Sequence, residues 1–174
     1  MGEASYYTPT GGLPPQTQLL SDRAMFREAY AVIPRGTNSD IVTSFLPFWT
    51  DTRLWVLARP LTGFAETFSQ YMVEVAPGGG SERPELNPEA EGVVFLTAGL
   101  LHITLDATEH KLEPGGYAYL PPGAAWTVRN EGSENAHFHW IRKAYEKVDG
   151  LDVPEAFVTN ERDVEAGSMP DTDG

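Results

Sequence analysis

Short runs of β-branched and aromatic residues, separated by Gly, Pro, Asn and Asp, dominate the sequence from Ile41 to Tyr145. In the run LLHITLD, Leu101, Ile103 and Leu105 alternate with polar residues, which is the period of a strand with one buried face. Many short strands of this kind are typical of a β-sandwich or a β-barrel. The sequence therefore predicts an all-β fold, with further strands in RLWVLAR, TFSQYMVEV, GVVFLTAG, YAYLP, AWTVRN and HFHWIRKAY.

The length and composition fit one such domain. The chain has 174 residues, of which 41% are hydrophobic, enough to bury a core of ordinary size. Residues 1–20 hold scattered Gly and Pro with little periodicity, and we expect an extended N-terminal arm there. After Tyr145 the chain becomes acidic and poor in large apolar residues. We expect a barrel over residues 21–146 and an acidic linker or tail over residues 147–174.

Charge and missing motifs exclude several classes of function. A formal net charge of -13 disfavours nucleic acid and anionic lipid as partners. The sequence has no cysteine, which excludes disulfides and thiolate sites, and it has no GxSxG, HExxH, P-loop or GxGxxG motif. The first residues have neither a basic nor an apolar region, so we expect no secretory signal, and the sequence has no apolar run of membrane-spanning length. We expect a soluble, cytoplasmic protein without a membrane partner.

Two stretches carry matching frames of glycines and polar positions. The second frame contains Gly115, Pro121-Pro122-Gly123, Trp126 and Asn130. The first contains Gly79, Glu85, Asn87, Glu91 and Gly99.

These frames resemble the two motifs of the cupin superfamily, and the resemblance covers about residues 65 to 143. It implies a double-stranded β-helix, a jelly-roll barrel in which both motifs converge on a divalent metal. Histidines with one carboxylate form a mixed N/O donor set suited to Mn, Fe, Ni or Zn. Here Glu85 and Asn87 stand at the two histidine positions of the first motif, Glu91 keeps the carboxylate, and Trp126 replaces the last histidine.

These substitutions predict a vestigial pocket that binds no metal. Trp126 offers no ligand atom, and its indole is large enough to fill the space of a metal and its substrate. Without a cation, Glu91 must lie near solvent, be protonated, or find a donor, for which Arg83 is the candidate. Glu85, Asn87, Glu91 and Trp126 remain the candidate residues for binding a ligand, and we assign no catalytic residue and no metal ligand.

A narrower resemblance extends over roughly residues 17 to 152. The stretches SDRAMFREAYAVIPRGTNSDIVTSFLPFW, TRLWVLARPLTGFAETFSQYMVEVAPGGG and FHWIRKAYEKVDGL are similar to the N-terminal part of the (S)-ureidoglycine aminohydrolases. That family consists of bicupins that hydrolyse ureidoglycine to ureidoglycolate and ammonia in allantoin and purine catabolism. In the family the N-terminal cupin has lost its metal ligands, and the C-terminal cupin binds Mn²⁺ and carries the catalytic site.

The resemblance implies that this chain is the non-catalytic half of such a bicupin and is inactive alone. The Mn²⁺ is then expected in a second, C-terminal cupin that this sequence does not contain. The expected partners are that second cupin domain or further copies of the chain. Two alternatives stay open: a stand-alone metal-free cupin that binds a small molecule, or a structural oligomerisation domain.

The four histidines do not form a ligand set in the sequence. We expect His102 and His110 to be solvated. His137 and His139 share one face of a late strand, a spacing that can chelate metal, but no carboxylate or third histidine stands at ligand spacing beside them. We interpret them as edge or interface residues.

Overall fold

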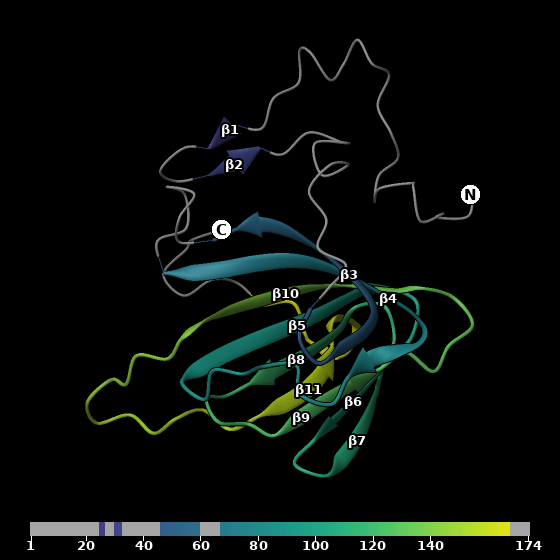
Figure 1. Ribbon diagram of the computed structural model, residues 1–174. Coiled ribbons are helices and arrows are strands. Elements are labelled where there is room, and N and C mark those ends of the chain that lie inside the picture. The colour runs from purple at the N-terminus through teal and green to yellow at the C-terminus, as the bar shows by residue number, and fades with distance from the viewer. Residues whose placement is uncertain (1–24, 27–29, 33–45, 60–66, 168–174) are drawn as a thin grey trace.

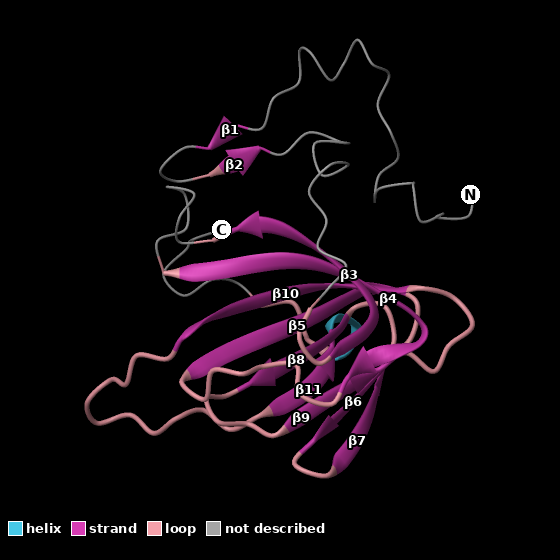
Figure 2. Ribbon diagram, viewed as in Figure 1, coloured by secondary structure: helices cyan, strands magenta, loops and turns pink. Residues whose placement is uncertain are grey.

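The structure is a computed structural model that describes residues 25–26, 30–32, 46–59 and 67–167, and it is built almost entirely of strands (Figures 1 and 2). The described elements are β1 Met25–Phe26, β2 Ala31–Val32, β3 Trp49–Ala58, β4 Phe68–Ser81, β5 Ala90–Ala98, β6 Leu101–Leu105, β7 Thr108–Leu112, β8 Gly116–Leu120, β9 Trp126–Arg129, β10 Ala136–Ala144, β11 Phe157–Asn160 and the 3-10 helix η3 Glu161–Asp163. The predicted all-β jelly-roll barrel is confirmed.

One strand, β4, links the two sides of the barrel. The main sheet has the order β11-β8-β5-β10-β4-β9-β6-β7, and β3 also pairs with β4. The 14-residue β4 pairs with β10 through its first part, up to Val75, and with β9 only at Gly80 and Ser81. All of these pairings are antiparallel. The strand therefore passes from one side of the barrel to the other and bends the sheet around its core (Figure 1).

The glycines of APGGGS make this passage possible. Gly78 and Gly80 have positive φ angles of 79° and 145°, which L side chains rarely adopt. A Cβ at Gly80 would also collide with the carbonyl oxygen of Val128 on β9. These glycines thus lie within a strand, where they allow a close backbone approach.

The core lies between the two sides of the barrel, as the period-2 pattern predicts. Leu101, Ile103 and Leu105 are buried on β6, and β8 has the same alternation, with Ala118 and Leu120 facing inward. Burial of this continuous apolar set is the main stabilising term of the fold. The core also contains Leu54, Val73, Val75, Val94, Leu96, Leu112, Trp126, Val128, Ala136, Phe138 and Trp140.

Part of the stretch expected to be a linker joins the sheet. Residues Phe157–Asn160 form β11 and pair antiparallel with β8, and the turn of η3 follows directly. The expected arm over residues 1–20 lies outside the described residues. Among the described residues, none of the helices is long and apolar enough to cross a membrane.

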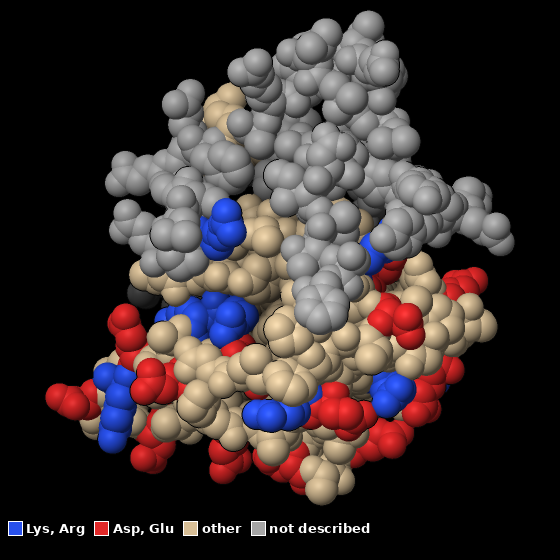
Figure 3. Space-filling model, in the orientation of Figure 1, with Lys and Arg blue, Asp and Glu red and all other residues tan. Residues whose placement is uncertain are grey.

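The acidic excess lies on the surface. On the face shown in Figure 3, Asp and Glu side chains are scattered over the barrel, with Lys and Arg among them. The described residues on this face form no extended basic surface, which a nucleic-acid site needs.

Candidate functional site

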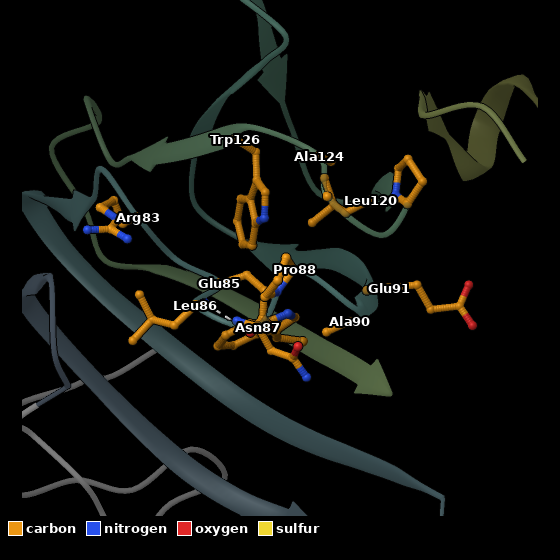
Figure 4. A pocket seen from close by; sticks show the side chains of 14 residues that line it. Arg83, Glu85, Leu86, Asn87, Pro88, Ala90, Glu91, Leu120, Ala124 and Trp126 are labelled. Atoms are coloured by element: carbon orange, nitrogen blue, oxygen red, sulfur yellow. Dashed lines mark hydrogen bonds between the residues drawn. The ribbon is translucent and has the colours of Figure 1, made fainter. Parts of the chain in front are cut away.

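The segment between β4 and β5 crosses one end of the barrel and divides it into two hollows. The hollows share Glu85, Leu86 and Asn87 of this segment and Trp140 of β10 as lining residues. The first hollow has a volume of about 360 Å³ and the second about 510 Å³. Glu85, Asn87, Glu91 and Trp126, the candidates from the sequence, all line the first hollow (Figure 4).

Trp126 forms a buried part of the wall of the first hollow. Its side chain is on β9, is only 7% exposed and belongs to the core. The ring packs edge-to-face on Trp140, with centroids 6.0 Å apart and an interplanar angle of 76°. Figure 4 shows the indole directed toward the segment of Leu86, Asn87 and Pro88. An aromatic pair of this geometry stabilises the fold beyond simple burial, and it presents no metal ligand.

Glu85 anchors the crossing segment to the barrel. Its carboxylate accepts hydrogen bonds from Nε and Nη2 of Arg142 on β10, at 2.5 and 2.6 Å. The same carboxylate accepts the backbone N–H groups of Leu86 and Asn87, at 3.0 and 2.8 Å. A bidentate arginine pair with additional backbone donors is a strong and directional interaction. The carboxylate of Glu85 therefore clamps the segment in place.

Asn87 completes the local turn. Its Oδ1 accepts the backbone N–H of Glu89 at 3.0 Å, an Asx-turn that shapes the chain before β5. Both positions that carry histidine in the cupin pattern thus hold side chains that order the segment.

Glu91 is among the residues that line the first hollow, but Figure 4 shows its side chain directed away from it. Its Oε2 accepts a hydrogen bond from the Tyr119 hydroxyl at 2.8 Å, and Lys143 Nζ lies 3.4 Å from its Oε1. Burial, together with this hydrogen bond and the charge of Glu91, raises the pKa of Tyr119 above its ordinary range. The prediction that Arg83 is the donor to Glu91 is wrong, because Tyr119 and Lys143 contact this carboxylate. The guanidinium of Arg83 lies over the Phe48 ring, 5.0 Å from its centroid.

The first hollow does not fit a metal ion. The Glu85 carboxylate is held by Arg142, the Asn87 oxygen by a backbone N–H, and the Glu91 carboxylate is directed elsewhere. Across the part of the chain that the structure describes, His, Asp and Glu side chains form no group of three or more that could hold a metal ion.

A second cluster of ionisable side chains lies on the outer face of the sheet. His137 Nε2 is 3.6 Å from Glu74 Oε2, and Glu74 also accepts Nε of Arg53 at 2.7 Å and its Nη2. Burial lowers the pKa of His137, the charge of Glu74 opposes this shift, and the charge of Arg53 adds to it. Burial also lowers the pKa of His139.

Glu74 is 4% exposed, and sequence reasoning missed it. The available signal is a lone acid inside the apolar run YMVEV.

Two further residues from the sequence analysis, Asn130 and His102, have defined partners in the structure. Asn130 is fully buried, and its Nδ2 donates to the carbonyl oxygens of Val75 and Glu134, both at 2.8 Å. His102 is not simply solvated: its Nδ1 lies 3.0 Å from Glu109 and 3.7 Å from Glu131.

Comparison with known proteins gives this geometry a family context. Residues 71–142 match the cupin domain family. The (S)-ureidoglycine aminohydrolase of Escherichia coli strain K12 is 24% identical over 133 residues, which cover 76% of this chain and 49% of that protein. The chain thus spans about half the length of the curated relative that it matches.

Two solved structures extend the likeness over nearly the whole chain. A glyoxylate-induced protein from Pseudomonas aeruginosa is 59% identical with a TM-score of 0.80, and the match covers 98% of this chain and 61% of that one. The Escherichia coli protein Ylba is 23% identical with a TM-score of 0.74, over 87% of this chain and 61% of that one, and it shows the same fold.

Proposed function

We propose that this chain is the non-catalytic N-terminal half of a bicupin similar to (S)-ureidoglycine aminohydrolase. Two findings support this proposal: residues 71–142 match the cupin domain family, and the chain is similar to that enzyme. Its role is architectural: it supports a second cupin, which carries Mn²⁺ and hydrolyses ureidoglycine to ureidoglycolate and ammonia.

The observation that carries this proposal is the state of the four cupin ligand positions. Trp126 is buried against Trp140, and Glu85 is paired with Arg142. Every donor that a metal would need is therefore either absent or engaged in holding the fold. A barrel whose ligand positions serve packing and ion pairing is suited to support a partner domain, and it is not suited to activate water.

The lengths of the relatives support the same proposal. The matched region covers 49% of the aminohydrolase, and the match with the 59%-identical Pseudomonas aeruginosa protein covers 61% of that chain. In both relatives, the part corresponding to this chain is accompanied by more protein.

The test combines elemental analysis with an assay of ammonia release from (S)-ureidoglycine. We expect the purified chain to hold no stoichiometric metal after dialysis and to release no ammonia. We expect a chimera, in which this chain replaces the matching region of the Escherichia coli aminohydrolase, to hold Mn²⁺ and to release ammonia. One equivalent of manganese on the chain alone, or turnover by it, contradicts the proposal, as does a chimera that folds and holds Mn²⁺ but releases no ammonia.

A second candidate function is favoured by the hollows at the barrel end. Their volumes of about 360 and 510 Å³ are within the range of small-molecule sites, so a metal-free cupin that binds a small ligand is the alternative. A ligand-dependent rise in Tm supports this alternative, whereas a stable oligomer in light scattering without any ligand response supports a purely structural subunit.

A further inference from the structure

The second hollow is an apolar, aromatic site with one ion pair, Arg142 and Glu85, at its rim. Its walls come from β3, β4 and β10 and include Trp49, Leu54, Val56, Tyr71 and Trp140, with Arg142 beside them. The rings of Trp49 and Tyr71 lie 5.8 and 5.6 Å from that of Trp140, so they form one continuous aromatic surface. Such a surface suits a planar, apolar molecule.

The cation of this hollow already binds a carboxylate. Arg142 holds both oxygens of Glu85 in a bidentate arrangement, and its guanidinium lies 5.6 Å from the centroid of the Trp140 ring. The Arg142 side chain is 27% exposed, so a dissolved molecule can reach it. The fork geometry of arginine matches a carboxylate, whatever molecule supplies it.

Glu85 can leave Arg142 without losing all its partners. The backbone N–H groups of Leu86 and Asn87 continue to donate to its carboxylate, and they belong to the same segment. A ligand carboxylate that replaces Glu85 on Arg142 therefore leaves the Glu85 carboxylate with these two backbone donors. The exchange keeps one ion pair on Arg142, and burial of the apolar body of the ligand provides the net stabilisation.

We propose that the second hollow binds an organic carboxylate with a planar, apolar body, whose carboxylate displaces Glu85 from Arg142 while the body packs on Trp140, Trp49 and Tyr71. In the free protein, Glu85 occupies the position of the ligand carboxylate. This site adjoins the hollow around Trp126, with which it shares Glu85 and Trp140, and it does not depend on the bicupin proposal or on a metal.

Phenylacetate is the probe, and phenylacetamide and acetate are the matched controls. Titration of the full chain, followed by tryptophan fluorescence and calorimetry, is expected to give a Kd for phenylacetate at least about tenfold lower than for either control. Phenylacetamide has the same body without the charge, and acetate has the charge without the body. Equal affinity for phenylacetate and phenylacetamide overturns the proposal.

Two variants locate the site. Arg142→Met is expected to weaken phenylacetate binding at least about tenfold, and Glu85→Gln to strengthen it, because the competing charge is gone. Arg129→Met is the control, since Arg129 pairs with Glu82 at the surface, at 2.9 Å, outside this hollow. If Arg142→Met fails to fold by circular dichroism, Glu85→Gln decides alone: unchanged or weaker binding by that variant contradicts the displacement.

Discussion

The inner and outer faces of the same two strands, β4 and β10, have opposite chemistry. Inward, Val73, Val75, Phe138 and Trp140 form an apolar surface around the barrel interior. Outward, the neighbouring positions carry Glu74, His137 and His139. These strands carry two histidines and a buried carboxylate, but on the face opposite the barrel interior.

Strand geometry makes this separation strict. Successive side chains of a strand point to opposite faces, so His137 and His139 can enter the barrel only through a one-residue shift of the register. Such a shift would also expel Phe138 and Trp140 from the core. A histidine in the sequence can therefore serve as a ligand inside the barrel only if its position in the strand faces inward.

The inner face gives the largest expected effect. Trp126→Ala removes a 7%-exposed ring from the core and its contact with Trp140, and we expect a loss of about 3–5 kcal/mol in the free energy of unfolding. Urea denaturation measures it. Phe157→Ala, at a 49%-exposed ring of β11, is the control and should cost far less. A loss below about 1 kcal/mol would show that the barrel interior does not depend on this indole.

The outer face provides the next test. Glu74→Gln removes the charge that Arg53 and His137 face, and we expect a loss of about 3 kcal/mol because the pair is buried. Glu82→Gln is matched to it, since Glu82 also pairs with an arginine, but at 73% exposure. The control should change stability by about 0–1 kcal/mol in the same denaturation experiment. Equal losses in the two variants would remove the distinction between the buried pair and the surface pair.

The sequence predicts the fold better than it predicts the orientation of the site residues. Alternation such as that of Leu101 and Ile103 depends only on local geometry, so it indicates buried strands reliably. The spacing of the motifs likewise brings Glu85 and Trp126 to one hollow.

The sequence does not predict the ion-pair and hydrogen-bond partners of Glu85 and Glu91. Arg142 lies 57 residues from Glu85 in the chain, and only the β10 register brings the two together. For the same reason, Arg83 is the wrong donor for Glu91, because the pairing of β5 with β8 and β10 places Tyr119 and Lys143 beside that carboxylate.

A fall in pH should lower the free energy of unfolding through protonation of His139 on the outer face. Burial lowers the pKa of His139, so the folded state binds this proton less tightly than the unfolded state does. The stabilisation is present above the unfolded-state pKa of about 6.5 and is lost as the pH falls from there through the folded-state pKa. His139→Gln should therefore reduce the fall in the urea midpoint between about pH 7.5 and about pH 5.5. His110→Gln, on β7, is the control, and an unchanged slope in His139→Gln contradicts the assignment.

The smallest expected effect on stability is that of Glu91→Gln, which tests whether the Glu91 carboxylate is structural or binds a metal. Glu91→Gln weakens the contacts with Tyr119 and Lys143, and we expect a loss of about 1 kcal/mol, since the Glu91 side chain is 17% exposed. Tyr119→Phe, which removes the same hydrogen bond from the other side, should cost a similar amount. Excess Mn²⁺ should leave the Tm of the unmodified chain and of Glu91→Gln unchanged. If Mn²⁺ instead raises the Tm of the unmodified chain but not that of Glu91→Gln, then Glu91 turns into the hollow to bind the ion, and the contrast between the two faces is lost.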